Sequence, residues 1–414
     1  MNGNRKVEGI KGVKVFAGID VGKEAHYLSL IEKDGMVKAA GIRIDNNREG
    51  FEEMLKLLEK AGGKETVAVG FEPTGHYWKA AGYYLQEKGY RPYLVNPFHV
   101  RLSKELRDNR QRKTDKKDSQ LIAHLVREGK YMNSRLLAGE YEDLRRLTIV
   151  REKIVQEMIR CQVRLKAALD EYLPEYEKCF CKLTIKTSLE LLKRFGLTGL
   201  RSEAKEEEVA KAIVMISRQR ISASRAAGIV ATLKGSIGVK EGLSGAEVEL
   251  RTWIRQIEGY REDLNNLEER IKTILIKTEE AKYLMSIKGV GVITAAIVLG
   301  QTGSFANYSN AKKLEKLAGL DLVENSSGNR IGQKSISKRG RDLFRHALYR
   351  IALVAIAKSK EIKWLYEYKI NELKKKKMIA ITDITVKLLR IMFALVKNKS
   401  MYDGRLVLQA MPCS

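Results

Sequence analysis

Residues 13–44 read VKVFAGIDVGKEAHYLSLIEKDGMVKAAGIRI, and this stretch decides the fold of the N-terminal part of the chain. Two runs rich in β-branched and aromatic residues, 13–20 and 27–32, predict strands. Lys33-Asp34-Gly35 supplies Asp-Gly turn chemistry before a third predicted strand near 37–44. We therefore predict an antiparallel three-stranded start.

Helices and strands alternate after this start. Apolar residues at helical spacing predict a helix over about 47–60, and the apolar run TVAVGF predicts a strand over 66–71. The remaining expected elements are a helix near 76–88, a strand at 91–95 and helices near 97–106 and 116–129. This order is the one expected of a ribonuclease-H-like α/β domain.

The later part of the chain is mostly helical in pattern. Apolar residues recur at three- and four-residue intervals over about 139–170, interrupted by Arg151, and more regularly over 250–274. Such seams are typical of coiled coils, and the two helices could pair within the chain or between chains. They could also pack as amphipathic helices on their own domain. The stretch between them, about 175–245, is basic and carries no recognisable chemistry.

Composition points to a polyanionic partner. The 414 residues include 77 Lys and Arg against 51 Asp and Glu, a net charge of +26, which favours nucleic acid. Because no apolar run is long enough to span a membrane and the N-terminus lacks a signal-peptide core, we expect a cytoplasmic protein with no membrane partner. Four dispersed cysteines give no disulfide scaffold, and their single Cys-x-Cys pair is a weak zinc signal.

Four acidic residues stand where predicted elements end or begin. Asp20 closes the first strand, and Glu72 ends an apolar run before a Pro-Thr-Gly turn. Asp115 and Asp118 share one face at the start of a helix. Clustered carboxylates favour Mg²⁺ or Mn²⁺, and two such ions about 3.5–4 Å apart support phosphodiester cleavage. Taken alone, Asp115 and Asp118 could instead be helix N-terminal charges that favour the macrodipole.

Two basic segments have the character of phosphate-binding surfaces. One covers 101–113, and in the other, GNRIGQKSISKRGRD (328–342), small residues between the cations let backbone amides approach a phosphate. No zinc-finger spacing or heptad-linked basic region indicates base readout. The expected nucleic-acid contacts are Arg110, Arg112, Lys113, Arg330, Lys334, Lys338, Arg339 and Arg341.

These motifs, in this order and spacing, resemble one known family over nearly the whole chain. The motifs are GIDVGK (18–23), FEPTGHYW (71–78), the block VNPFHVRLSKELRDNRQRKTDKKDSQLIA (95–123) and the C-terminal part 286–352. They are similar to the insertion-sequence "one-ten" transposases, also called DEDD transposases or bridge-RNA-guided recombinases. The resemblance implies a recombinase that excises and inserts a mobile element in double-stranded DNA.

The resemblance also implies an architecture of class α/β plus all-α. We expect an RNase-H/RuvC-like domain over 1–133, a coiled-coil helical domain over 134–280 and a mostly helical transposase domain over 281–400. The implied metal ligands and catalytic acids are Asp20, Glu72, Asp115 and Asp118. The implied partners are donor and target DNA, a structured guide RNA and further copies of the chain, as a dimer or tetramer.

In that family a serine of the second domain attacks DNA and becomes joined to the phosphate. The family's Ser-Gly motif falls on Ser327-Gly328, with Ser326 directly before it, and our prediction is Ser327. Taken by itself, an Asn-Ser-Ser-Gly stretch favours an ordinary turn. A serine hydroxyl needs an activator to become a nucleophile. The only histidine nearby is His346, so activation by a metal ion on the four acids is the more economical hypothesis.

Two other functions remain open. A RuvC-like, metal-dependent Holliday-junction nuclease would need the four acids but no serine, because water would be its nucleophile. A non-catalytic nucleic-acid-binding protein descended from such an enzyme would also explain the charge, although the presence of all four acids argues against it.

Overall fold

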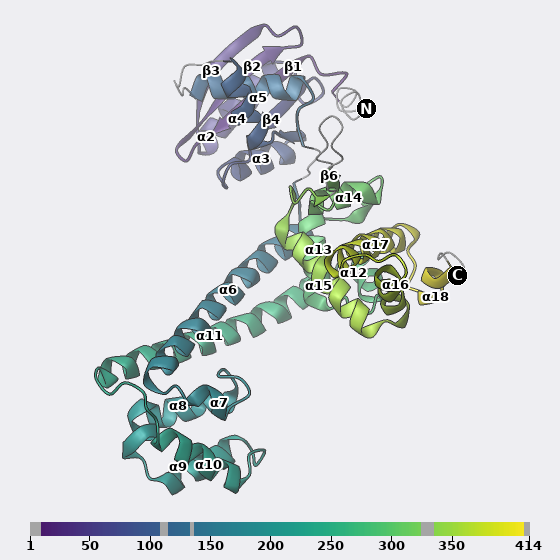
Figure 1. Cartoon of the computed structure of the whole chain (residues 1–414). Coiled ribbons are helices and arrows are strands. Elements are labelled where there is room, and N and C mark those ends of the chain that lie inside the picture. Colours follow the sequence, from purple (N-terminus) through teal and green to yellow (C-terminus); the bar gives the residue numbers. More distant parts are fainter. Residues whose placement is uncertain (1–9, 108–114, 133–135, 324–334, 410–414) are drawn as a thin grey trace. The chain divides into compact units, whose positions relative to one another are not determined.

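The computed structural model describes residues 10–107, 115–132, 136–323 and 335–409. The chain divides into two units, Met1–Leu137 and Ala138–Ser414 (Figure 1). Each unit has hydrophobic clusters of its own. In the described part of the chain, no helix is long and apolar enough to cross a membrane.

The first unit is built on a sheet whose described strands run in the order β3-β2-β1-β4-β5. Neighbouring strands are antiparallel from β1 to β3, while β4 runs parallel to β1 and β5 parallel to β4. The antiparallel start and the mixed α/β character expected from the sequence are therefore confirmed. The strands are β1 (Val15–Val21), β2 (Ala25–Glu32), β3 (Val37–Asp45), β4 (Val67–Phe71) and β5 (Pro92–Leu94).

Helices cover both faces of this sheet because the alternation of β1 presents apolar residues to both sides. Val15, Ala17 and Ile19 lie in one buried cluster, whose helical residues come from α2 and α3. Phe16 lies in a second cluster, with residues of α5. The helices are α2 (Arg48–Lys60), α3 (Trp78–Glu87), α4 (Pro97–Arg107) and α5 (Asp115–Arg127).

Two long helices of the second unit, α6 (Glu140–Tyr172) and α11 (Leu243–Leu275), pack along each other (Figure 1). Arg151, which interrupts the apolar seam of α6, places its guanidinium 2.6 Å from Glu268 Oε1 on α11. The pairing therefore lies within the chain, and an ion pair fills the break in the seam. Supercoiling of the two helices stays a prediction.

Between these two helices the chain forms a small helical lobe with its own buried cluster. The mostly helical pattern expected for 175–245 is confirmed. Cys161 and Cys179 are buried there and Cys181 is exposed, all as free thiols, and the Cys161 thiol contacts Gln256 Oε1 at 3.1 Å. The elements are α7 (Tyr176–Cys179), α8 (Lys186–Thr198), the π-helix η1 (Gly199–Glu203), α9 (Glu206–Ile216) and α10 (Ala223–Lys234).

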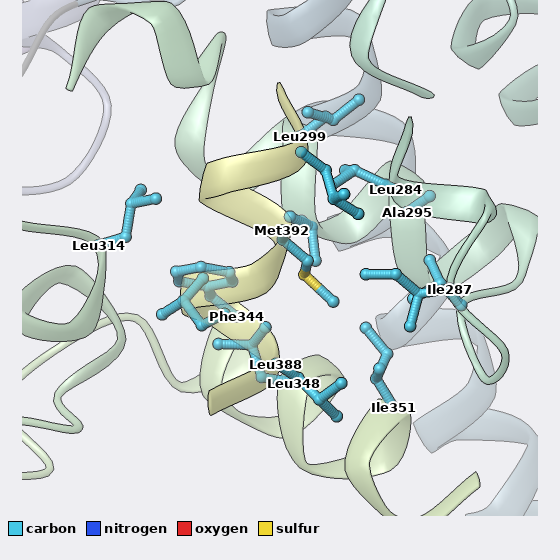
Figure 2. Packing of buried hydrophobic residues seen from close by; sticks show 14 of the residues in the cluster. Leu284, Ile287, Ala295, Leu299, Leu314, Phe344, Leu348, Ile351, Leu388 and Met392 are labelled. Atoms are coloured by element: carbon cyan, nitrogen blue, oxygen red, sulfur yellow. The ribbon is translucent and has the colours of Figure 1, made fainter. Parts of the chain in front are cut away.

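The C-terminal part of the second unit is mostly helical, as expected. Figure 2 shows part of its core, to which three different helices contribute Leu284, Phe344 and Met392. Burial of each such large side chain contributes roughly 1.5–3 kcal/mol. The elements are α12 (Glu280–Met285), α13 (Val292–Thr302), the 3₁₀-helix η2 (Phe305–Asn307), α14 (Ala311–Ala318), β6 (Leu322–Val323), β7 (Ser335–Ile336), α15 (Asp342–Lys358), α16 (Lys360–Asn371), α17 (Lys377–Asn398) and α18 (Gly404–Gln409).

Candidate active site

The ends of β1 and β4 bring two of the predicted acids to the same edge of the sheet. The strands are parallel, and Ile19 pairs with Phe71. Asp20 is the next residue of β1 and Glu72 directly follows β4, so the two acids reach this edge side by side. Both side chains are half-buried. Thr74, in the turn after β4, donates a hydrogen bond from its hydroxyl to Glu72 Oε1 at 2.9 Å and so orients that carboxylate.

Helix α5 lies directly against this part of the sheet, with glycine at the closest point. A Cβ on Gly18 would stand 2.0 Å from the backbone oxygen of Ser119, so only glycine leaves room for the helix. Ser119 Oγ also shares a buried 2.7 Å hydrogen bond with Ser29 Oγ. Because Ser29 pairs with Gly18 across the β1–β2 ladder, these contacts fix the position of α5 along β1.

The direction of α5 places its first turn at the edge that carries Asp20. Ser119, near the start of the helix, packs at Gly18, two residues before Asp20. At the other end of the helix, Arg127 Nη1 donates to the carbonyl oxygen of Lys33, at the turn that follows β2. Asp118 therefore lies toward Asp20. Asp115 is the first residue of α5, but its side chain lies outside the described ones.

Substitution of Gly18 should disturb this arrangement. We expect Gly18→Ala to destabilise the packing of α5 on β1 by about 1–3 kcal/mol, because the obstacle is backbone and not the end of a flexible side chain. Amide hydrogen exchange in β1 and α5 of the full chain would report this as lost protection. The matched control is Gly12→Ala, whose added Cβ would meet nothing within 4 Å. Equal protection in the two variants would contradict the prediction.

Asp118 already has a cationic partner. Lys104 Nζ, on α4, lies 2.6 Å from Asp118 Oδ2, and the Asp118 side chain is only 16% exposed. The sequence grouped Lys104 with the basic segment 101–113. Its contact with an acid 14 residues away depends on the packing of α4 against α5. No spacing rule within a single helix would have identified it.

The donor set is compatible with a divalent metal. Asp20, Glu72 and Asp118 offer hard carboxylate oxygens, and the ammonium on Asp118 shows that a cation is accommodated there. Among the described side chains, no group of three acids, histidines or cysteines is close enough to hold one ion, and Asp115 is not among those side chains. Asp20, Glu72 and the start of α5 are thus gathered at one edge, and their roles as ligands stay a prediction.

The predicted nucleophile and several predicted nucleic-acid contacts lie outside the described residues. Ser326, Ser327, Arg330 and Lys334 fall within 324–334, and Arg110, Arg112 and Lys113 fall within 108–114. The two ends of the serine-bearing segment are described. Val323 of β6 pairs with Ser335 of β7 in an antiparallel ladder, so the two ends lie side by side.

The base of this ladder is anchored to the helices around it. The Ser337 hydroxyl and Asp321 Oδ1 form a hydrogen bond beside the ladder. Gly340 lies against Gly319, where a Cβ would stand 2.3 Å from the Gly319 nitrogen. Arg345 Nη1, on α15, donates to the carbonyl oxygen of Ala318 at 2.9 Å. The serine-bearing segment therefore departs from a base held by α14 and α15.

The basic residues after β7 differ in their surroundings. Lys338 and Arg339 have exposed side chains. Arg341 instead donates a hydrogen bond to the carbonyl oxygen of Gln301 and lines, with Arg145, an open pocket of about 610 Å³. Burial, and then repulsion from Arg145, lowers the pKa of Arg341 to about 10, which leaves it protonated at neutral pH. A role of Arg341 in nucleic-acid binding stays a prediction.

Two family models match the chain. A model described as a transposase of the DEDD, IS110 type matches residues 17–174, which include the four acids. A second, described as the transposase IS116/IS110/IS902 family, matches residues 281–367, which include Ser327. The two matches together cover more than half of the chain.

Curated relatives are similar over most of their length. The insertion element IS110 uncharacterized 43.6 kDa protein of Streptomyces coelicolor is 22% identical over 95% of this chain and 96% of its own length. The insertion element IS900 uncharacterized 42 kDa protein of Mycobacterium paratuberculosis is 24% identical over 94% and 97%. The transposase for insertion sequence element IS1111A of Coxiella burnetii is 21% identical over 82% and 77%.

Proposed function

The chain belongs to the IS110 family of transposases, and from this premise we propose that it cleaves and exchanges DNA strands with divalent metal on four acids and a serine nucleophile. The family makes the protein a DNA-recombining enzyme, whose partner is DNA. The observation that carries the proposal is the register of β1 and β4, which puts Asp20 beside Glu72 at the edge toward which α5 begins.

We propose a RuvC-like role for the first unit. Asp20, Glu72, Asp115 and Asp118 would hold Mg²⁺ or Mn²⁺, and such ions, when bound, stabilise negative charge on the scissile phosphate. The protein's own contribution is to fix the carboxylates. Thr74 orients Glu72, and the tight contact of α5 with β1 sets the position of Asp118 relative to Asp20.

The serine step is a transesterification. Ser327 Oγ attacks phosphorus, a Ser–O–P bond forms as one bridging P–O bond of the DNA breaks, and the leaving oxygen takes up a proton as the serine loses one. A DNA hydroxyl then attacks the phosphoserine, which joins the new strands and restores the serine. Because one phosphate ester replaces another in each step, no further energy source is needed.

We propose that a structured guide RNA selects the donor and target sites. The net charge of +26 suits binding to phosphate backbones, and the sequence has no motif for base readout, so base pairing would supply the specificity. Exchange between two DNA sites calls for more than one active site, which favours a dimer or tetramer.

A junction assay tests the proposed function. The gene with its native flanking DNA is placed on a plasmid, and the circularised element ends are amplified with outward primers. We expect a junction from the wild type and none from a chain that lacks the acids. A wild-type chain without junctions, tested with its complete flanking DNA, would contradict recombination.

A nuclease without serine chemistry is the second candidate. It is favoured by one observation: all four acids belong to the first unit, which would suffice for hydrolysis by water. In that case junctions would be absent, and cleaved DNA would carry free ends with no attached protein.

A further inference from the structure

Lys104 and Asp118 form a partly buried ion pair in the first unit. It joins two different helices, at 2.6 Å, with the lysine side chain 34% and the aspartate side chain 16% exposed. By comparison, Lys23 and Glu24 lie 3.6 Å apart, and their side chains are 74% and 81% exposed. The Lys104 pair is therefore a short, partly desolvated, charge-assisted hydrogen bond.

The position of this pair has a functional consequence. Asp118, in the first turn of α5, lies toward the edge of the sheet that carries Asp20 and Glu72. Carboxylates gathered at one edge repel one another when no cation is present. The Lys104 ammonium supplies one positive charge there by binding Asp118 Oδ2, and a bound divalent ion would compete with it for this carboxylate.

We propose that Lys104 is a displaceable counter-cation, which holds Asp118 in the metal-free protein and yields its oxygen to an incoming divalent ion. The inference rests on the proposed metal site. Lys104 can leave without unfolding the helix, because its ammonium is on a flexible four-carbon stem and part of the side chain already reaches solvent. The strength of the Lys104 contact then sets the concentration of divalent ion at which the site fills.

Direct titration of the full-length protein with Mn²⁺ tests this proposal, with free Mn²⁺ followed by its electron paramagnetic resonance signal. We expect Lys104→Met, which keeps the apolar stem and removes the competing charge, to bind Mn²⁺ about tenfold more tightly than the wild type. Lys104→Arg should restore weaker binding. Asp118→Asn should lose the site.

The matched control is Arg101→Met. Arg101 lies one turn earlier on α4, its side chain is 76% exposed, and it pairs at 4.0 Å with Glu105. Its removal deletes the same charge without touching Asp118, so we expect a change in Mn²⁺ affinity within about twofold. Equal affinities for Lys104→Met and Arg101→Met, or weaker binding by Lys104→Met than by the wild type, would overturn the proposal.

A second measurement uses only the wild type and therefore does not depend on the folding of a variant. Brief labelling of amines with acetic anhydride, read by mass spectrometry, should modify Lys104 faster when Mn²⁺ is present, because the released ammonium is no longer held by Asp118. Labelling that is unchanged or slower would count against displacement.

The outcomes separate this inference from the function on which it rests. If Asp20→Asn and Asp118→Asn abolish Mn²⁺ binding but Lys104→Met does not strengthen it, only the proposed role of Lys104 is wrong. If Mn²⁺ binding is unchanged in Asp20→Asn and Asp118→Asn, both the proposed metal site and this inference are wrong.

Discussion

Asp20→Asn is expected to lower strand cleavage by at least about 10²-fold while leaving the affinity for DNA unchanged. The substitution keeps the size of the side chain and removes the negative charge that a divalent ion needs. Affinity should persist because the removal of one acid makes a protein with a net charge of +26 no less basic. Cleavage is measured on labelled donor DNA with the guide RNA and Mg²⁺, and affinity for the same DNA is measured by filter binding without Mg²⁺.

The control for Asp20 is Asp45→Asn. Asp45 also ends a strand, β3, but its carboxylate is exposed and pairs with Arg43 at 2.9 Å. We expect its cleavage rate to match the wild type. Cleavage by Asp20→Asn at the wild-type rate would contradict the proposed metal site. Cleavage by Glu72→Gln at the wild-type rate would contradict it as well.

Ser327→Ala is expected to eliminate every covalent protein–DNA adduct. Alanine has no oxygen that could form the phosphate ester, so no neighbouring change can restore the bond at this position. To measure the adduct, labelled donor DNA is incubated with the protein, the guide RNA and metal. The sample is then denatured and separated, and protein that stays attached to the label is detected.

The matched variant for Ser327 is the adjacent serine. Ser326→Ala should keep the adduct. An adduct that survives Ser327→Ala and disappears in Ser326→Ala would move the nucleophile by one residue. Free DNA ends with no adduct in the wild type would favour hydrolysis by water, as in the nuclease alternative.

Much of the first unit was predictable because its signals are local. Alternating and continuous apolar runs, together with the Asp-Gly turn, predict the three antiparallel strands at almost their observed bounds. The same runs place Asp20 and Glu72 at strand ends, since a strand stops where its apolar pattern stops. The long helices α6 and α11 were likewise predictable from their apolar seams. The sequence did not decide whether the two helices pair within one chain.

Contacts between distant elements were not predictable in this way. The sequence placed Lys104 and Arg341 among surface cations by their charge. In the fold, Lys104 binds Asp118 and Arg341 donates to a backbone carbonyl. Each partner lies on another helix, and the choice of partner depends on how the helices pack.

The sequence by itself determined the kinds of elements, the acids at their ends, the basic character of the surface and the family motifs. These follow from residue type and from periodicities of a few residues, which act within one helix or strand. Only the tertiary structure decided that β4 pairs in parallel with β1, that α5 rests on Gly18, and that Lys104 reaches Asp118. Such pairings join segments far apart in the chain, because they depend on which surfaces bury one another and not on any local pattern.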